Sequence, residues 1–405
     1  MSFELFISKR LFKKNGDNFS APIIKLAVIS IALGVATMLI SISIALGFQH
    51  AIKEKVAGFE GHIRISNFDY NQSYELTPIA TDNKLLATLS TDKRIKSISK
   101  FAIKGGILKS KNIIEGVVIK GVDSNYNKSF FNSCMLKGTF PKISDSKISN
   151  EILISSTIAN KLNVNVGDNI LMYFVQNPPK IRKFKISGIY NSGFSELDSK
   201  FIIGDINQIQ RLNLWKNNEV SGYEIMLNEI KYIEDVNSKI YRMIGYNIKS
   251  ETLMQRYPMI VDWLNLLDTN VLFIIVLMIL ISGVTIVSIF LILILEKTNL
   301  IGTLKALGAT NLSIRKIFIY KSINLIIRGL IIGNIVGLGL LFIQYNFSII
   351  PLNPENYYIN TVPVKFNILL IIVLNLGTIA ISVIMLLWPA SIIAKILPAK
   401  AIKFR

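Results

Sequence analysis

The residue types that most often perform catalysis or bind metals are scarce in this chain of 405 residues. It contains two histidines, His50 and His62, and one cysteine, Cys134. A structural zinc site needs about four Cys or His ligands, and a nucleophilic cysteine needs a histidine base. Nucleotide-loop, HExxH and GxSxG motifs do not occur, and Gly105-Gly106 lacks the context of a phosphate-binding loop. We therefore expect no catalytic residue, no metal and no cofactor bound by this chain.

The apolar residues are concentrated in four nearly uncharged stretches. Each is long enough to cross a hydrocarbon core of about 30 Å at about 1.5 Å per residue. The first exceeds the 7 to 15 residues or so of a signal-peptide core and has no clear cleavage site, so we interpret it as a retained anchor. The predicted transmembrane helices are residues 23–48, 271–295, 323–343 and 366–393.

Basic residues indicate the orientation of these helices. They gather before the first helix, between the second and third, and after the fourth, whereas residues 344–365 are nearly neutral. By the positive-inside rule, both termini are cytoplasmic, as are segments 296–322 and 394–405. Residues 49–268 and the loop 344–365 then lie outside. The net charge of +19 does not indicate nucleic-acid binding, because the lysines are spread along the chain and form no single basic face.

The N-terminal segment 1–22 mixes apolar and basic side chains. Phe3, Phe6 and Phe12 alternate with Lys9 and Arg10, which favours a short amphipathic helix at the cytoplasmic membrane surface. A solvated basic tail is the alternative.

Residues 49–268 have the composition of an α+β domain inserted between the first and second membrane helices. With one cysteine it cannot form an internal disulfide. Stretches 51–59 and 259–267 could extend the flanking helices outward as stalks. The length allows two subdomains, with a seam near 137–149. Predicted strands are 151–155, 169–175 and 182–190, and predicted helices are 205–214 and 230–244.

The most informative segment is Glu296 to Thr310, EKTNLIGTLKALGAT. It predicts a short helix with Ile301, Leu304 and Leu307 on one apolar face, ended by Gly308, although a plain turn between helices is the alternative. The segment resembles the coupling helix of FtsX/MacB-type ABC transporter permeases, whose pattern is E-I-G-x-L-K-A-L-G-A. Leu300 departs from it, since relatives often carry an acidic residue there. The end of the chain, including WPAS at 388–391 and LPAKAIK at 397–403, is similar to the family's closing motif.

This resemblance implies a fold like that of type VII ABC permeases and a separate ATPase subunit that binds ATP and Mg. It also implies a second permease subunit, which could be a copy or a sister chain, in a bacterial inner membrane. The residues that would contact the ATPase are Ile301, Gly302, Thr303, Leu304, Lys305, Ala306, Leu307 and Gly308.

The architecture resembles in particular the lipoprotein-releasing LolC/LolE permeases, which implies a lipoprotein substrate and a periplasmic carrier. A MacB-like efflux permease and an FtsX-like signalling element acting on a cell-wall hydrolase are the alternatives. In LolC-type subunits a hairpin recruits the carrier, and its counterpart here would lie at 174–182. An ordinary rigid turn is the other interpretation of this segment. The candidate docking residues are Gln176, Asn177, Pro178, Pro179 and Arg182.

The third membrane helix carries small residues and one cation. Gly329, Gly333 and Gly337 recur every four residues, which predicts one face where another helix backbone approaches closely. Arg328 lies near the cytoplasmic end, so we expect it to extend toward the headgroups rather than to hold substrate.

Overall fold

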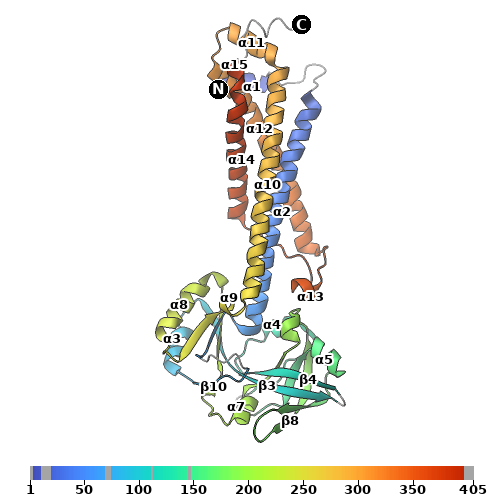
Figure 1. Ribbon diagram of the computed structural model, residues 1–405, viewed down its shortest axis with the longest axis vertical. Coiled ribbons are helices and arrows are strands. Elements are labelled where there is room, and N and C mark those ends of the chain that lie inside the picture. Colours follow the sequence, from blue (N-terminus) through green and yellow to red (C-terminus); the bar gives the residue numbers. More distant parts are fainter. Residues whose placement is uncertain (1–2, 11–19, 69–73, 111–112, 145–146, 396–405) are drawn as a thin grey trace. The chain divides into compact units, whose positions relative to one another are not determined.

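The computed structural model describes residues 3–10, 20–68, 74–110, 113–144 and 147–395 (Figure 1). The chain divides into two compact units. We call the first the membrane unit; it takes in residues 1–49, 263–350 and 362–405. We call the second the outer unit, and it consists of residues 50–262 and 351–361.

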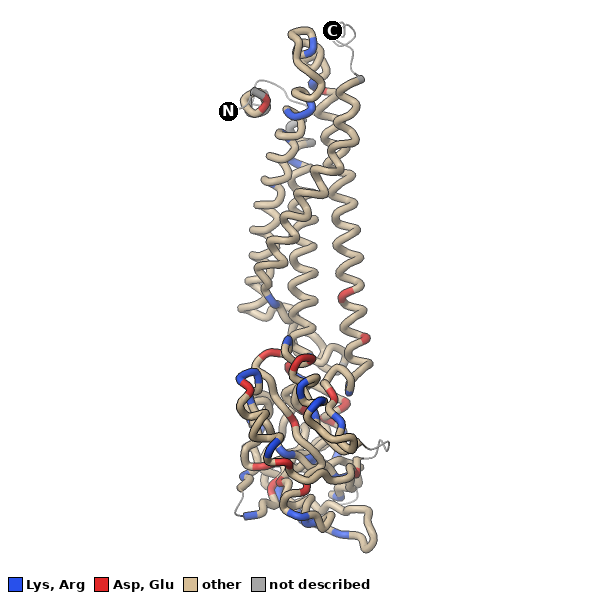
Figure 2. The backbone as a smooth tube through the Cα atoms, turned by 90° about the vertical axis from the view of Figure 1, so that its left-hand side faces the viewer, with Lys and Arg blue, Asp and Glu red and all other residues tan. Residues whose placement is uncertain are grey.

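Four long helices of the described chain are apolar enough to cross a membrane. Charged residues are rare along them, as Figure 2 shows for the membrane unit. Three shorter helices belong to the same unit. The long helices are α2 (Ser20–Glu60), α10 (Pro258–Glu296), α12 (Asn311–Phe347) and α14 (Ile368–Ala390), and the short ones are α1 (Phe3–Arg10), α11 (Thr298–Ala306) and α15 (Ile392–Lys395).

Three of the long helices, α2, α10 and α12, extend beyond the apolar stretches predicted to cross the membrane. α2 and α10 continue past their apolar parts into the segments proposed as stalks. α12 begins at Asn311, so the expected cytoplasmic loop 296–322 is helical over most of its length. Hydropathy misses this part because charges are tolerated outside the hydrocarbon, while Ile314 and Phe318 keep the helical spacing and are buried. The expected N-terminal helix is α1, which packs on α12; residues 11–19 lie outside the described chain.

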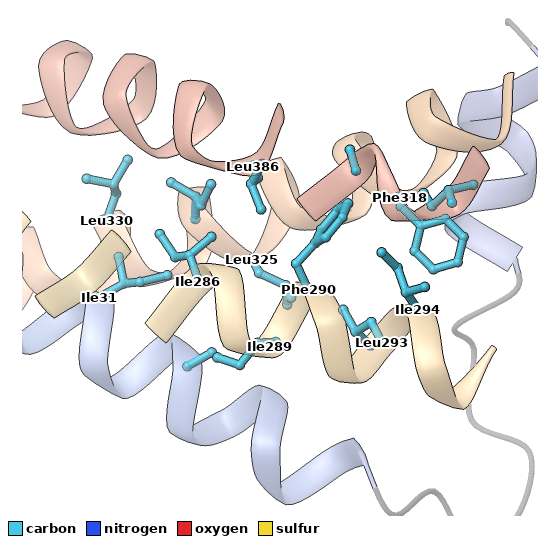
Figure 3. Packing of buried hydrophobic residues seen from close by; sticks show 14 of the residues in the cluster. Ile31, Ile286, Ile289, Phe290, Leu293, Ile294, Phe318, Leu325, Leu330 and Leu386 are labelled. Atoms are coloured by element: carbon cyan, nitrogen blue, oxygen red, sulfur yellow. The ribbon is translucent and has the colours of Figure 1, made fainter. Parts of the chain in front are cut away.

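The membrane helices pack around a continuous apolar cluster at one end of the unit (Figure 3). Phe290 of α10 meets Phe318 of α12 edge to face, with ring centroids 6.3 Å apart. Ile31 of α2 and Leu386 of α14 belong to the same cluster. The cluster also contains Ile301, so α11 is part of this packing.

The outer unit is built on a ten-stranded mixed sheet in the order β12-β1-β11-β3-β4-β9-β6-β8-β5, with β7 pairing both β3 and β8. These pairings close a circuit of six strands, β3-β4-β9-β6-β8-β7. The strands of the sheet are β1 (Ile63–Asn67), β3 (Ile95–Ser110), β4 (Ile113–Val122), β5 (Met135–Gly138), β6 (Glu151–Ser155), β7 (Asn169–Phe174), β8 (Lys180–Tyr190), β9 (Phe201–Asp205), β11 (Gly222–Leu227) and β12 (Ile248–Thr252). A separate pair is formed by β2 (Ile79–Ala80) and β10 (Glu219–Val220).

Strands before and after residues 137–149 belong to the same sheet, and the seam between subdomains expected there stays a prediction. The sheet joins its open part to the closed circuit through β3. The first half of β3 pairs with β11, and Ile107 to Lys109 pair with β7. Between them, a Cβ on Gly106 would lie 3.0 Å from the Tyr173 carbonyl oxygen of β7. Glycine at 106 therefore permits the close approach of the β7 backbone.

Short helices cover this sheet or connect its strands. The strands and helices predicted between residues 151 and 244 coincide with β6, β7, β8, α7 and α8 to within about two residues, apart from a 3₁₀ turn, η1, that opens the last helix. The helical elements are α3 (Asn83–Ser90), α4 (Ser129–Ser133), α5 (Ser156–Leu162), α6 (Ser195–Asp198), α7 (Ile206–Asn213), η1 (Ile230–Tyr232), α8 (Ile233–Met243), α9 (Leu253–Arg256) and α13 (Pro354–Tyr357).

Candidate functional site

The predicted coupling segment forms α11, a nine-residue helix between α10 and α12. Its end is set by Gly308, whose φ of +90° is favourable only for glycine, and Thr310 then caps α12 by accepting a hydrogen bond from the Ser313 amide. Ile301 and Gly302 are buried against the membrane unit. Thr303 and Ala306 are exposed, and the Leu307 side chain is 80 % exposed.

The expected apolar face made of Ile301, Leu304 and Leu307 is therefore wrong. Six residues of an α-helix turn through about 600°, so Ile301 and Leu307 point about 120° apart. Ile301 packs inward, Leu304 lies between, and Leu307 points to solvent. The outward residues, including Asn299 and Thr303, form the surface of α11 that a second protein could contact.

α11 is also tied to the end of the fourth membrane helix. The Lys305 ammonium donates to the Ile393 carbonyl at 2.9 Å and lies 3.4 Å from the Ala394 carbonyl. Both carbonyls belong to α15, whose C-terminal groups have no helical partner of their own. Lys305 therefore joins α11 to α15, and the residues 396–405 that complete the expected closing motif lie outside the described chain.

The three glycines of α12 face α2. A Cβ at Gly329 would lie 2.7 Å from Ile31, one at Gly333 would lie 2.7 Å from the Ala32 carbonyl, and one at Gly337 would lie 3.0 Å from the Ala36 Cα. A side chain at these positions would have to displace helix backbone or a β-branched side chain. The spacing of four residues thus corresponds to a close contact between α12 and α2.

The end of α2 is anchored in the core of the outer unit. Phe59 is fully buried, and its ring lies 5.5 Å from Phe131 and 5.6 Å from Phe201, centroid to centroid. The Phe131 ring in turn lies 5.2 Å from that of Tyr190. Edge-to-face pairs of this kind add about 0.5–1.5 kcal/mol each beyond the area they bury.

Beside Phe59 lies a buried charge cluster, which we call the anchor cluster. Arg256 of α9 donates to the Glu60 carboxylate at 2.6 Å and to the Glu60 and Gly61 carbonyls at 3.3 and 3.2 Å. Both side chains are under a tenth exposed. The cluster thus joins the end of α2 to the residues that precede α10. Its members are Glu60, Arg64, Lys120, Glu224 and Arg256.

Lys120 holds the anchor cluster to the sheet. Its ammonium donates to the Phe59 carbonyl and to Glu224 of β11 at 2.8 Å, and it is completely buried in β4. Burial lowers the pKa of Lys120, while Glu224 and Glu60 act in the opposite direction. The sequence analysis did not find this cluster. One feature of the sequence could have revealed the cluster: a lysine lies inside the apolar run VVIKGV of β4. A lysine buried in such a strand requires an acidic partner.

The candidate carrier-docking segment is the hairpin between β7 and β8, whose last ladder pair is Phe174 with Lys180. Asn177, Pro178 and Pro179 are exposed at its tip, as is Val175 (76 %). The tip is held by Gln176 and Lys180, which both donate to the Leu212 carbonyl in the last turn of α7, at 3.5 and 3.0 Å. Arg182 is half-buried and donates to the Ile181 carbonyl.

Part of the expected loop 344–365 belongs to the outer unit. Residues 351–361, which include α13, carry Tyr358, whose ring stacks on Phe194 with centroids 4.7 Å apart. The Lys55 ammonium of α2 donates to the Tyr358 carbonyl at 2.7 Å. The connection between α12 and α14 is therefore held by the outer unit through this contact.

Burial keeps His62 and Cys134 uncharged at pH 7. His62 is buried, and its Nδ1 accepts a hydrogen bond from the Leu227 amide at 3.1 Å. Burial, with a smaller effect of Lys96, lowers the pKa of His62 to about 4, so the ring is neutral at pH 7. Burial raises the pKa of Cys134 to about 11, so its thiol is protonated. Within the described ranges, no three His, Cys, Asp or Glu residues gather as a metal site would require.

Two family models match the chain. The MacB-like periplasmic core domain matches residues 26–242, and the FtsX-like permease C-terminal region matches residues 272–398. Together they span the hairpin, α11, the membrane helices that follow and every member of the anchor cluster except Arg256.

Curated relatives match over nearly their full length. The lipoprotein-releasing system transmembrane protein LolC of Buchnera aphidicola subsp. Schizaphis graminum is 28 % identical, covering 98 % of this chain and 97 % of that protein. LolC of Haemophilus influenzae is 24 % identical (99 % and 98 %), and LolE of the same organism is 23 % identical (99 % of each). Among solved structures, the periplasmic region of MacB from Actinobacillus actinomycetemcomitans is 13 % identical over 52 % of this chain and 98 % of that one, with a TM-score of 0.36, which is too low to support an argument.

Proposed function

Because this chain belongs to the ABC transporter permeases that join a MacB-like periplasmic core domain to an FtsX-like C-terminal region, we propose that it is driven by a separate ATPase to release lipoproteins from the bacterial inner membrane. ATP and Mg bind to the ATPase subunit. A second permease subunit completes the membrane part, and the LolC and LolE relatives favour a sister chain in that place. Both termini and α11 lie on the cytoplasmic side, where the basic residues gather.

The observation that carries this proposal is the two-sided structure of α11. Its inner face, with Ile301, is packed into the core of the membrane unit, so force applied to α11 reaches the membrane helices. Its outer face presents Thr303, Ala306 and Leu307 to the ATPase. Leu307, which directly follows the last residue of α11, adds an exposed apolar side chain to this surface.

The outer unit converts helix movement into cargo release. α2 is a continuous helix up to Glu60, where the anchor cluster joins it to the residues before α10. Movement of α2 and α10 therefore moves the outer unit's sheet. The β7–β8 hairpin, with Asn177 to Pro179 at its tip, docks the periplasmic carrier. The names of the relatives support the lipoprotein substrate.

The test is release of a triacylated lipoprotein from proteoliposomes that contain this chain, its sister permease and the ATPase, with a soluble carrier. We compare Leu307→Asp with Leu214→Asp, because Leu214 of the outer unit is 84 % exposed and undergoes the same chemical change. L307D should abolish ATP-dependent release and ATPase binding, whereas L214D should leave both intact. Normal release by L307D would refute the coupling role. Robust ATPase activity without any release in the unmodified complex would favour efflux or signalling instead.

A further inference from the structure

We infer that a groove between α2 and α12 binds one anionic phospholipid of the cytoplasmic leaflet. The groove has a volume of about 470 Å³, within the usual range of ligand pockets. Its walls are apolar, with Val28 and Ile29 from α2 and Ile331 and Ile332 from α12. Among the described residues that line it, Lys25 and Arg328 are the charged ones.

The groove follows from the close contact of the two helices. At Gly329 the α12 backbone comes so near α2 that an added Cβ would lie 2.7 Å from Ile31 and 3.3 Å from the Val28 carbonyl. Two helices that touch at a glycine leave a furrow along the side of the contact, because the next side chains diverge from it. Here those side chains are β-branched, and Ile29, Ile331 and Ile332 are exposed at 54 %, 55 % and 45 %.

The two cations of the groove lack an acidic partner within the described residues. Lys25 and Arg328 are both exposed, and in the described part of the chain no acidic side chain lies within 4.0 Å of either. Another cation of α12, Lys321, is close enough to Arg328 for the two to interact unfavourably. A groove that presents uncompensated cations beside an apolar surface is complementary to a ligand with an anionic head and an apolar tail.

The depth of Arg328 agrees with a headgroup position. From Arg328 to Phe347, the last residue of α12, the helix rises about 28 Å. That is close to the thickness of one hydrocarbon core, about 30 Å. With the orientation proposed above, Arg328 therefore lies at the cytoplasmic boundary between acyl chains and headgroups, where anionic lipids are available and cations attract them. A phospholipid satisfies both the charge and the apolar walls, whereas free phosphate satisfies only the charge.

The experiment is native mass spectrometry of the full chain in an uncharged detergent, titrated with phosphatidylglycerol or with phosphatidylcholine of the same acyl chains. The unmodified chain should retain one phosphatidylglycerol in preference to phosphatidylcholine. Removal of each cation should weaken that binding about fivefold, and K25Q/R328Q should weaken it about 25-fold. K25R/R328K should retain it. The control K316Q/K365Q removes two exposed cations of the membrane unit that do not line the groove, and should bind normally.

A second variant tests the apolar walls without altering charge. Ile332→Trp fills the groove and should prevent lipid retention, whereas Ile335→Trp, at a 67 % exposed position of α12 outside the groove, should not. Any of three results would overturn the inference: equal retention of the two lipids, equal binding by K25Q/R328Q and the unmodified chain, or competition by millimolar inorganic phosphate. A further pair of results would also overturn the inference: the second permease subunit displaces the lipid when it associates, and K25Q/R328Q associates with that subunit more weakly. The groove would then be a subunit interface.

Discussion

Replacing Arg256 by methionine tests the anchor cluster most directly. Arg256 makes three hydrogen bonds to Glu60 and Gly61, and its side chain is 8 % exposed. R256M keeps much of the apolar volume but leaves the Glu60 carboxylate, 5 % exposed, without its nearest cation. Breaking a buried ion pair by removal of one partner costs about 3–5 kcal/mol. Arg64, at 3.8 Å from Glu60, compensates only in part.

The assay is native-state hydrogen exchange of the full chain, followed on peptides that cover β1 and β12, the two strands nearest in sequence to this pair. A loss of about 3 kcal/mol in local stability should accelerate their exchange by about 100-fold or more. Lys231→Met is the control, because the Lys231–Glu229 pair has the same 2.6 Å separation but is more than half exposed on both sides. It should not change exchange measurably.

A double-mutant cycle separates the pair from its surroundings. E60Q/R256M should be less destabilised than the sum of the single variants, by about 2–3 kcal/mol, because the two groups interact directly. Additive effects, or R256M exchange within about fivefold of the unmodified chain, would show that the anchor cluster does not hold α2 to α9. In that case the proposed transmission through the outer unit would need another route.

Three further predictions concern packing and pH. Gly333→Leu should destabilise the membrane unit by about 1–3 kcal/mol in thermal unfolding, because an added Cβ meets helix backbone, whereas Gly339→Leu, with open space around it, should not. Tyr358→Ala should remove a stacked ring and speed limited proteolysis within 351–361 with little change elsewhere; unchanged cleavage would refute the docking of this loop. The pKa of His62 is lowered to about 4 in the folded chain, against 6.5 in the unfolded chain. Its contribution to the free energy of unfolding should therefore be complete above pH 6.5 and decrease as the pH drops toward 4, with a loss of about 2 kcal/mol at pH 5. His62→Asn, which keeps an acceptor for the Leu227 amide, should lose this component when thermal unfolding at pH 7 and pH 5 is compared; Asp198, whose pKa burial raises to about 6, has the opposite sign and is common to both proteins.

The local features of this protein could be predicted from its residues because they depend on short-range patterns. Hydrophobic length identified the four membrane helices, and short β-branched runs between Gly, Asn and Pro residues located β6, β7 and β8. The sequence between Glu296 and Thr310 identified a short helix and the family. The spacing of Gly329, Gly333 and Gly337 indicated one face of α12, since helical geometry alone places residues four apart on the same side.

Only the tertiary structure decided which partners these elements meet. Helical spacing alone places Ile301 and Leu307 about 120° apart, but which of the two packs inward depends on where the neighbouring helices lie. The anchor cluster joins residues up to 196 positions apart, such as Glu60 and Arg256. Gly106 is explained by a strand about 65 residues later in the chain. Long-range pairing, buried charge and the groove at Gly329 arise from the approach of distant segments, and no local pattern in the sequence specifies that approach.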